Sequence, residues 1–270
     1  MESVQAETIK RRCDEICDLL ASRRQVRVHE LARHFRVSAV TIRRDLAWLE
    51  GQGKLRRTRG GAMPAAQIEF SFEEKIALAK PEKEAIGRAA ASLAKPGDSI
   101  ILDSGSTTYL AARFLRNIQG ITIVTNSIPP ILELRNAHGV EVIALGGVLN
   151  RTSAEFVGPS LRMGLDGLHA TMAFLGADGL TVARGAQTAT ASAADSARLL
   201  AEHAEQRIVL ADASKIGRDS FVTYLECQLI TRVITAGKLD ARAEEECRRL
   251  RDCGIDIVCA DCLDTKGNGV

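Results

Sequence analysis

The chain has 270 residues, of which 46% are hydrophobic, 26% are charged and only 4% are aromatic, and its net charge is +2. This composition is typical of a globular protein with one large and one small domain, and it excludes disordered and fibrous chains. No apolar run approaches the roughly 18–20 residues that span a bilayer and no signal-peptide pattern opens the chain, so we expect a cytoplasmic protein with no membrane partner.

The charge is unevenly divided along the chain. The first 62 residues contain 14 lysines and arginines against 8 acidic residues, whereas the remainder contains 22 basic and 26 acidic residues. A basic N-terminal part joined to a slightly acidic body indicates that the N-terminal part alone meets a polyanion.

Three helices are predicted within residues 1–62. Apolar residues recur with a helical period over residues 6–22, 28–37 and 38–50. The third helix begins with Ser38, whose hydroxyl suits the N-cap position. We interpret this region as a winged helix-turn-helix domain.

The third helix has one buried and one exposed face. Ile42, Leu46 and Leu49 form the apolar stripe, which turns the arginines of "TIRRDL" away from the core. Arginine binds guanine or phosphate, whereas Asp45 is expected to orient an arginine or to pair within the three-helix unit. The residues of this helix predicted to contact double-stranded operator DNA are Ser38, Val40, Thr41, Arg43 and Arg44.

A basic hairpin follows the third helix. Gly51 and Gly53 end the helix, and a short alternating segment then runs to the pair Gly60 and Gly61. This pattern predicts a wing that lies along the phosphate backbone. Its predicted DNA-binding residues are Lys54, Arg56, Arg57 and Arg59.

Residues 63–80 are interpreted as a linker, and residues 81–270 as a Rossmann-like, mostly parallel α/β domain. Continuous apolar runs alternate there with helical segments, which is typical of a sheet covered on both faces. Strands are expected at residues 99–103, 121–126, 140–147, 171–179, 207–215, 229–237 and 254–260, and helices at residues 82–94, 107–116, 128–137, 189–204 and 240–252.

Small and polar residues follow several of these strands. Ligands of parallel sheets bind beyond the carboxyl ends of the strands, so we expect one shared small-molecule pocket there. The turn "LDSGSTT" leads into a helix whose first N–H groups suit a phosphate. The candidate residues at these strand ends are Asp103, Ser106, Thr107, Thr108, Asn126, Gly146, Gly147, Asp212 and Lys215.

Seven cysteines, an odd number, argue against a disulfide framework. The only CxxC motif is "CADC" at residues 259–262, and no second pair completes a zinc site. The chain also lacks the Walker A and GxGxxG motifs. We therefore predict no metal and no cofactor.

The segment "VSAVTIRRDLAWLEGQGKLRRTRGGA" resembles the N-terminal signature of the DeoR family of bacterial transcriptional regulators. The resemblance continues through "EKEAIG", "LDSGSTT", "IVTNS", "ALGGVLNR", "VGPS" and "ADASKIGR", over residues 7–262. It implies a C-terminal domain related to phosphosugar isomerases. It also implies that Asp103 and residues 105–108, including Gly105, form a phosphate-side loop, and that Asp178, Asp212 and Lys215 line the sugar side.

The sequence departs from that family pattern in one helix. Ala193 and Ala197 stand where the family usually carries a glutamate and a lysine, and only Arg198 remains. The leading interpretation is a repressor of a carbohydrate catabolism operon, released from DNA by a phosphorylated sugar and acting as a homo-oligomer, either dimer or tetramer. The alternatives are an oligomerisation module with a degenerate pocket and, less favoured, a phosphosugar isomerase; we expect a protein that is not an enzyme.

Overall fold

The computed structural model describes residues 2–23, 26–51, 54–58, 60–64 and 72–260. The chain divides into two units, residues 1–68 and 69–270. The first unit is called the head and the second the body.

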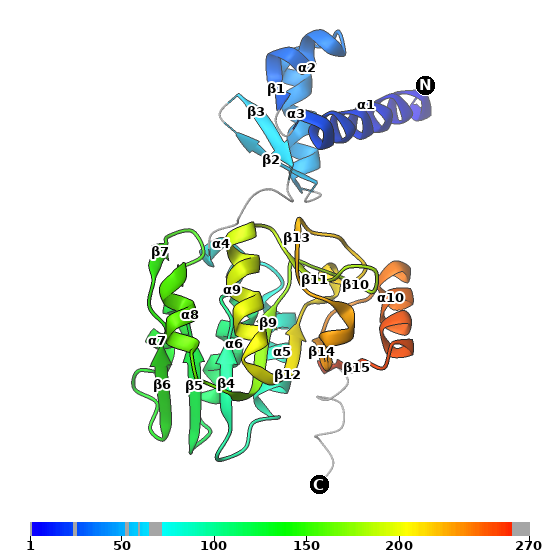
Figure 1. Cartoon of the computed structure of the whole chain (residues 1–270). Coiled ribbons are helices and arrows are strands. Elements are labelled where there is room, and N and C mark those ends of the chain that lie inside the picture. The colour runs from blue at the N-terminus through cyan, green and yellow to red at the C-terminus, as the bar shows by residue number, and fades with distance from the viewer. Residues whose placement is uncertain (1, 24–25, 52–53, 59, 65–71, 261–270) are drawn as a thin grey trace. The chain divides into compact units, whose positions relative to one another are not determined.

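The head is a winged helix-turn-helix unit, as predicted (Figure 1). Its strands form an antiparallel sheet in the order β1-β3-β2. Strand β1 escaped the sequence analysis because it has only two residues. The elements are α1 (Glu2–Arg23), β1 (Val26–Arg27), α2 (Val28–His34), α3 (Ala39–Gly51), β2 (Leu55–Thr58) and β3 (Gly61–Pro64).

The core of the head contains the predicted stripe of α3. Ile42, Leu46 and Leu49 are fully buried and pack with residues of α1 such as Ile16. The close approach of β1 to β3 requires a glycine, because a Cβ on Gly61 would lie 2.0 Å from the backbone oxygen of Val26. The packing of α1 against the buried stripe fixes the orientation of α3 within the head.

Asp45 pairs within the three-helix unit, one of the two roles expected for it. The Nε atom of Arg12 donates to its Oδ2 at 2.7 Å and the Nη2 atom to its Oδ1 at 3.1 Å. Because Arg12 donates these hydrogen bonds to the Asp45 carboxylate, the pKa of Arg12 is raised. This bidentate pair joins α1 to α3, so Asp45 faces away from the exposed arginines of α3.

The body is built on a parallel sheet of seven strands in the order β15-β14-β12-β9-β4-β5-β6. All seven predicted strand segments contribute one strand each. The strands are β4 (Ser99–Leu102), β5 (Ile121–Thr125), β6 (Val140–Ala144), β9 (Ala170–Gly176), β12 (Ala204–Leu210), β14 (Arg232–Thr235) and β15 (Asp256–Cys259).

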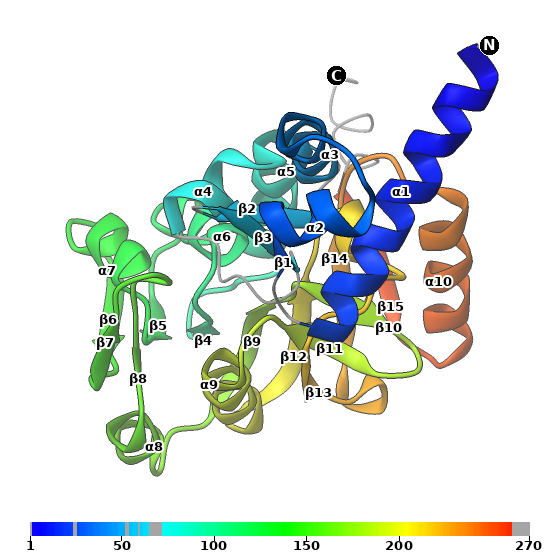
Figure 2. The same ribbon diagram turned by 90° about the horizontal axis from the view of Figure 1, so that it is seen from above.

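Helices cover both faces of this sheet (Figure 2). Residues of α5 and α6 pack on one face around Phe174, and residues of α9 pack on the other around Leu175. Phe174 and Leu175 are adjacent in β9, so their side chains point to opposite faces. The five predicted helices correspond to α5 (Lys80–Ala91), α6 (Ser106–Leu115), α7 (Ile128–Leu134), α9 (Ala191–Glu202) and α10 (Ala241–Asp252).

The body also contains elements that the sequence analysis did not predict. Helix α4 (Phe72–Ala77) lies inside the segment expected to be a linker, whose residues 65–71 lie outside the described residues. A second, small sheet has the order β10-β11-β13. The remaining elements are β7 (Val148–Asn150), β8 (Glu155–Val157), α8 (Pro159–Leu165), β10 (Gly179–Thr181), β11 (Gly185–Thr188), β13 (Val222–Leu225) and the 3-10 turns η2 (Ala213–Lys215) and η3 (Cys227–Leu229).

Candidate functional site

Helix α3 presents an exposed face at its N-terminal half. Arg43 and Arg44 are exposed, and Val40 retains 66% of its accessible surface. Ser38 caps the helix, since its Oγ accepts a hydrogen bond from the backbone N–H of Thr41 at 3.1 Å. A capped helix with a rigid buried face and an Arg-bearing outer face is suited to insertion into the DNA major groove.

The wing adds cations beside this helix. Lys54 is exposed, and Arg57 of β2 is held by Glu50, with an Nε to Oε2 distance of 2.8 Å. The structure does not describe the side chain of Arg56, and Arg59 lies outside the described residues. The Glu50 pair holds Arg57 next to the C-terminal end of α3.

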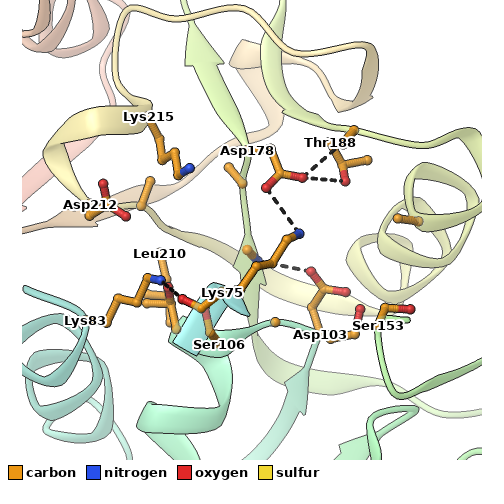
Figure 3. A pocket seen from close by; sticks show the side chains of 18 of the residues that line it. Lys75, Lys83, Asp103, Ser106, Ser153, Asp178, Thr188, Leu210, Asp212 and Lys215 are labelled. Carbon is orange, nitrogen blue, oxygen red and sulfur yellow. Dashed lines mark hydrogen bonds and ion pairs between the residues drawn. The ribbon is translucent and has the colours of Figure 1, made fainter. Parts of the chain in front are cut away.

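The body contains a pocket of about 350 Å³ at the carboxyl edge of its parallel sheet (Figure 3). The chain runs from β4 outward to β6 and then returns to β9 on the other side of β4. The loops after β4 and β9 therefore diverge, and such a switch point leaves a crevice at the edge of the sheet. Loops after β4, β9 and β12 line the pocket.

The structure brings seven of the predicted effector residues together around this pocket. They come from the loop after β4, the start of α6, the loop after β9 and the turn after β12. These lining residues are Asp103, Gly105, Ser106, Thr107, Asp178, Asp212 and Lys215.

Four predicted effector residues lie elsewhere. Thr108 is fully buried, and its hydroxyl donates to the backbone oxygen of Asp103 at 2.7 Å. It therefore stabilises the loop after β4 without lining the pocket. Asn126, Gly146 and Gly147 follow β5 and β6, which lie on the far side of β4 from the switch point. The sequence indicated that these residues end strands, but the order of strands in the sheet decides which ends meet.

Two lysines of the pocket were missed by the sequence analysis. Lys75 of α4 lies 3.3 Å from Asp178, measured from Nζ to Oδ1, and Lys83 of α5 donates to the backbone oxygen of Lys75 at 2.5 Å. Together with Lys215 they supply three amino groups to one pocket. Lys75 lay in the presumed linker, whereas the motif "EKEAIG" contained Lys83 and could have identified it.

Burial perturbs two of the ionisable groups. Burial, and next to it the charge of Glu155, raise the pKa of Asp103 to about 8, against the N–H of Gly176, which donates to Oδ2. Burial also lowers the pKa of Lys83 to about 8, against the attraction of Asp212. Near pH 7, Asp103 is therefore mostly protonated and Lys83 mostly charged, which favours an anionic ligand.

Asp178 remains ionised in the same pocket. Its burial opposes ionisation, but Lys75 and Lys215 outweigh this effect and lower the pKa of its carboxyl. The Oδ2 atom accepts hydrogen bonds from the hydroxyl of Thr188 and the N–H of Ala189, each at 3.1 Å. Asp212 has a more local role, because its Oδ1 accepts from the N–H of Ser214 and caps the η2 turn.

The described part of the chain contains neither a candidate metal-binding cluster nor a helix that could span a membrane. No group of histidine, cysteine or acidic side chains there is arranged to hold a metal ion. In the same residues, every helix is too short or too polar to cross a membrane. The six described cysteines form no disulfide with one another.

Comparison with known proteins supports the division into two units. The model of the DeoR-like helix-turn-helix domain matches residues 12–67, and that of the DeoR C terminal sensor domain matches residues 79–236. A putative aga operon transcriptional repressor of Escherichia coli O157:H7 is 36% identical over 251 residues, covering 92% of each chain.

Two further relatives are similar over most of their length. The HTH-type transcriptional repressor GlcR of Bacillus subtilis is 35% identical over 222 residues, which cover 82% of this chain and 85% of that protein. A lactose phosphotransferase system repressor of Streptococcus mutans is 32% identical over 231 residues, which cover 83% of this chain and 90% of that protein.

The winged head and the pocketed body define a DNA-binding transcriptional regulator with a sensor domain. Both domain models match in the expected order, and relatives above 30% identity span more than four fifths of the chain. The chain belongs to the DeoR family of transcriptional regulators.

Proposed function

We propose that the protein represses a carbohydrate catabolism operon and leaves its operator when a phosphorylated sugar occupies the pocket. The observation that carries this proposal is the pocket itself, where Lys75, Lys83 and Lys215 meet a mostly protonated Asp103. Such a pocket attracts an anion, and it stands in the same chain as an Arg-bearing recognition helix. The names of the aga operon and lactose phosphotransferase relatives support the carbohydrate assignment.

On DNA, α3 enters the major groove and the wing follows the phosphate backbone. Arg43 and Arg44 read base edges or phosphates, while Lys54 and Arg57 bind phosphates. The body forms a homo-oligomer that holds two or more heads at a fixed spacing. Operator half-sites then lie about one helical turn, or a multiple of it, apart.

In the pocket, the ligand phosphate binds among the lysines and the hydroxyl groups that follow β4. The sugar hydroxyls bind to Asp178 and to other polar groups of the pocket wall. A ligand that prefers one conformation of the protein shifts the population toward it, and coupling of this kind is of order 1–3 kcal/mol.

The test is operator affinity, measured by fluorescence anisotropy with and without a panel of pentose and hexose phosphates. A sugar phosphate that weakens operator binding at least about fivefold supports the proposal. No change with any member of the panel defeats the inducer assignment, and calorimetry without heat of binding then favours an oligomerisation module. Turnover of a sugar phosphate by the purified protein would show that the body is an enzyme.

A further inference from the structure

Helix α4 is the part of the body that comes next to the head in the sequence. Strand β3 ends at Pro64, and α4 begins at Phe72. Phe72 and Lys75 of this helix both line the pocket. A ligand in the pocket therefore contacts the segment through which the body is joined to the head.

Apolar burial holds α4 less firmly than it holds α5. None of its residues is buried, whereas α5 buries Ile86 and several alanines. At its N-terminus, the N–H of Phe72 donates to the backbone oxygen of Thr152 at 3.0 Å, and its ring meets Tyr109 edge-on. Because none of its residues is fully buried, the position of α4 depends in part on polar contacts.

Two of those contacts are made by groups of the pocket. Lys75 of α4 is paired with Asp178 of the loop after β9, and Lys83 of α5 donates to the backbone oxygen of Lys75. Figure 3 shows the side chain of Lys75 directed toward Asp178. An anion in the pocket attracts the same two amino groups, so it competes with the contacts that hold α4.

The joint between α4 and α5 is strained. Ala79 has a φ of 49° and lies in the left-handed region, immediately before Lys80 begins α5. That conformation is unfavourable for a non-glycine residue and persists only where the surroundings impose it. When the contacts of α4 change, the backbone at Ala79 is the place where the helix can turn.

We propose that α4 reports occupancy of the pocket to the head, and that Lys75 exchanges Asp178 for the anionic group of the ligand. The Lys75–Asp178 pair belongs to the conformation that binds the operator, and the ligand breaks it. The identity of the ligand as a sugar phosphate rests on the proposed function. The link from α4 to the head does not rest on the proposed function, because it can be tested without ligand.

The first experiment measures operator affinity of the full chain without ligand. Lys75→Met and Asp178→Asn each break the pair and are expected to weaken operator binding at least about fivefold. The control Lys80→Met removes an exposed lysine that does not line the pocket. It is expected to stay within about twofold of the parent chain.

Thermal melting and circular dichroism show which variants are folded. If Asp178→Asn fails to fold, the result for Lys75→Met is sufficient. The side chain of Lys75 is 28% exposed, so its replacement leaves no cavity in the core. The inference is overturned if folded Lys75→Met binds the operator as tightly as Lys80→Met.

The second experiment uses hydrogen exchange and mass spectrometry on the full chain, with the pentose and hexose phosphates of the panel as probes. Exchange of the α4 amides is expected to increase in the parent chain when a probe binds. A bound probe that leaves α4 exchange unchanged overturns the inference. If no probe binds, the proposed function fails, while the ligand-free variants still decide the role of α4.

Discussion

The pair between Arg12 and Asp45 allows a prediction about the stability of the head. Their side chains are only 12% and 7% exposed, and two hydrogen bonds of 2.7 and 3.1 Å join them. Asp45→Ala leaves the guanidinium buried without its partner, which costs about 3–5 kcal/mol. A domain of roughly 60 residues has a total stability of only about 3–9 kcal/mol, so we expect a head that is largely unfolded or barely folded.

Fluorescence of Trp48 during urea unfolding of the full chain measures this loss. It is the only tryptophan of the chain and lies on α3, so its signal reports the head and not the body. The matched control is Glu15→Ala, which removes the exposed partner of His34 in the same unit. An exposed pair contributes less than about 1 kcal/mol, so this control is expected to unfold close to the parent chain.

A double variant separates stability from DNA contact. Replacing both partners, as Arg12→Met with Asp45→Leu, removes the unpaired charge and is expected to recover most of the lost stability. Because Asp45 faces α1 and not the exposed side of α3, the double variant is also expected to bind the operator. This reasoning would be refuted if Asp45→Ala lowered the free energy of unfolding by less than about 1 kcal/mol. It would also be refuted if the double variant folded but did not bind the operator.

Three further predictions concern the recognition helix, the body and the pocket. Arg44→Ala is expected to reduce the free energy of operator binding by about 1–3 kcal/mol and to relax the preference at one base position. Arg57→Ala is expected to weaken binding to all DNA sequences alike and to make affinity less dependent on salt. Anisotropy titrations check both. Gly87→Ala is expected to destabilise the body by about 1–3 kcal/mol in urea unfolding, because the new Cβ would lie 2.8 Å from the backbone nitrogen of Ala111. Calorimetry is expected to show weaker binding of a sugar phosphate as the pH rises from 7 to 9. Over this range Asp103 gains negative charge and Lys83 loses positive charge, because each has a pKa of about 8. In Asp103→Asn the affinity is expected to fall less steeply with pH.

The pattern of apolar residues predicted the main elements because each buries one continuous face. The stripe of Ile42, Leu46 and Leu49 is fully buried, and all seven strands of the large sheet were located. Short elements without such a face were missed. Strand β1 has two residues and α4 has six, so both are too short to show a hydrophobic period clearly.

The membership of the pocket was predictable only in part. Asp103 and Asp178 follow β4 and β9, which are neighbours in the sheet although many residues separate them in the chain. Asn126 follows β5 with an equally polar signal but lies on the other side of β4. The sequence marks where strands end, whereas the order in which strands pair is set by packing across the whole body.

The distribution of charge in the pocket connects the ligand to α4. Helix α9 contributes only the methyl groups of Ala193 and Ala197 to the wall, so it offers no charged partner for an anion. The amino groups come instead from α4, α5 and the η2 turn, through Lys75, Lys83 and Lys215. An anionic ligand in this chain is therefore drawn to the side of the pocket where Lys75 lies. If α9 carried a lysine, the anion would have a second place to bind and α4 would be less sensitive to it. If α4 senses the ligand as proposed, the two alanines make the contact with Lys75 more important, because they leave the ligand's charge no partner on α9.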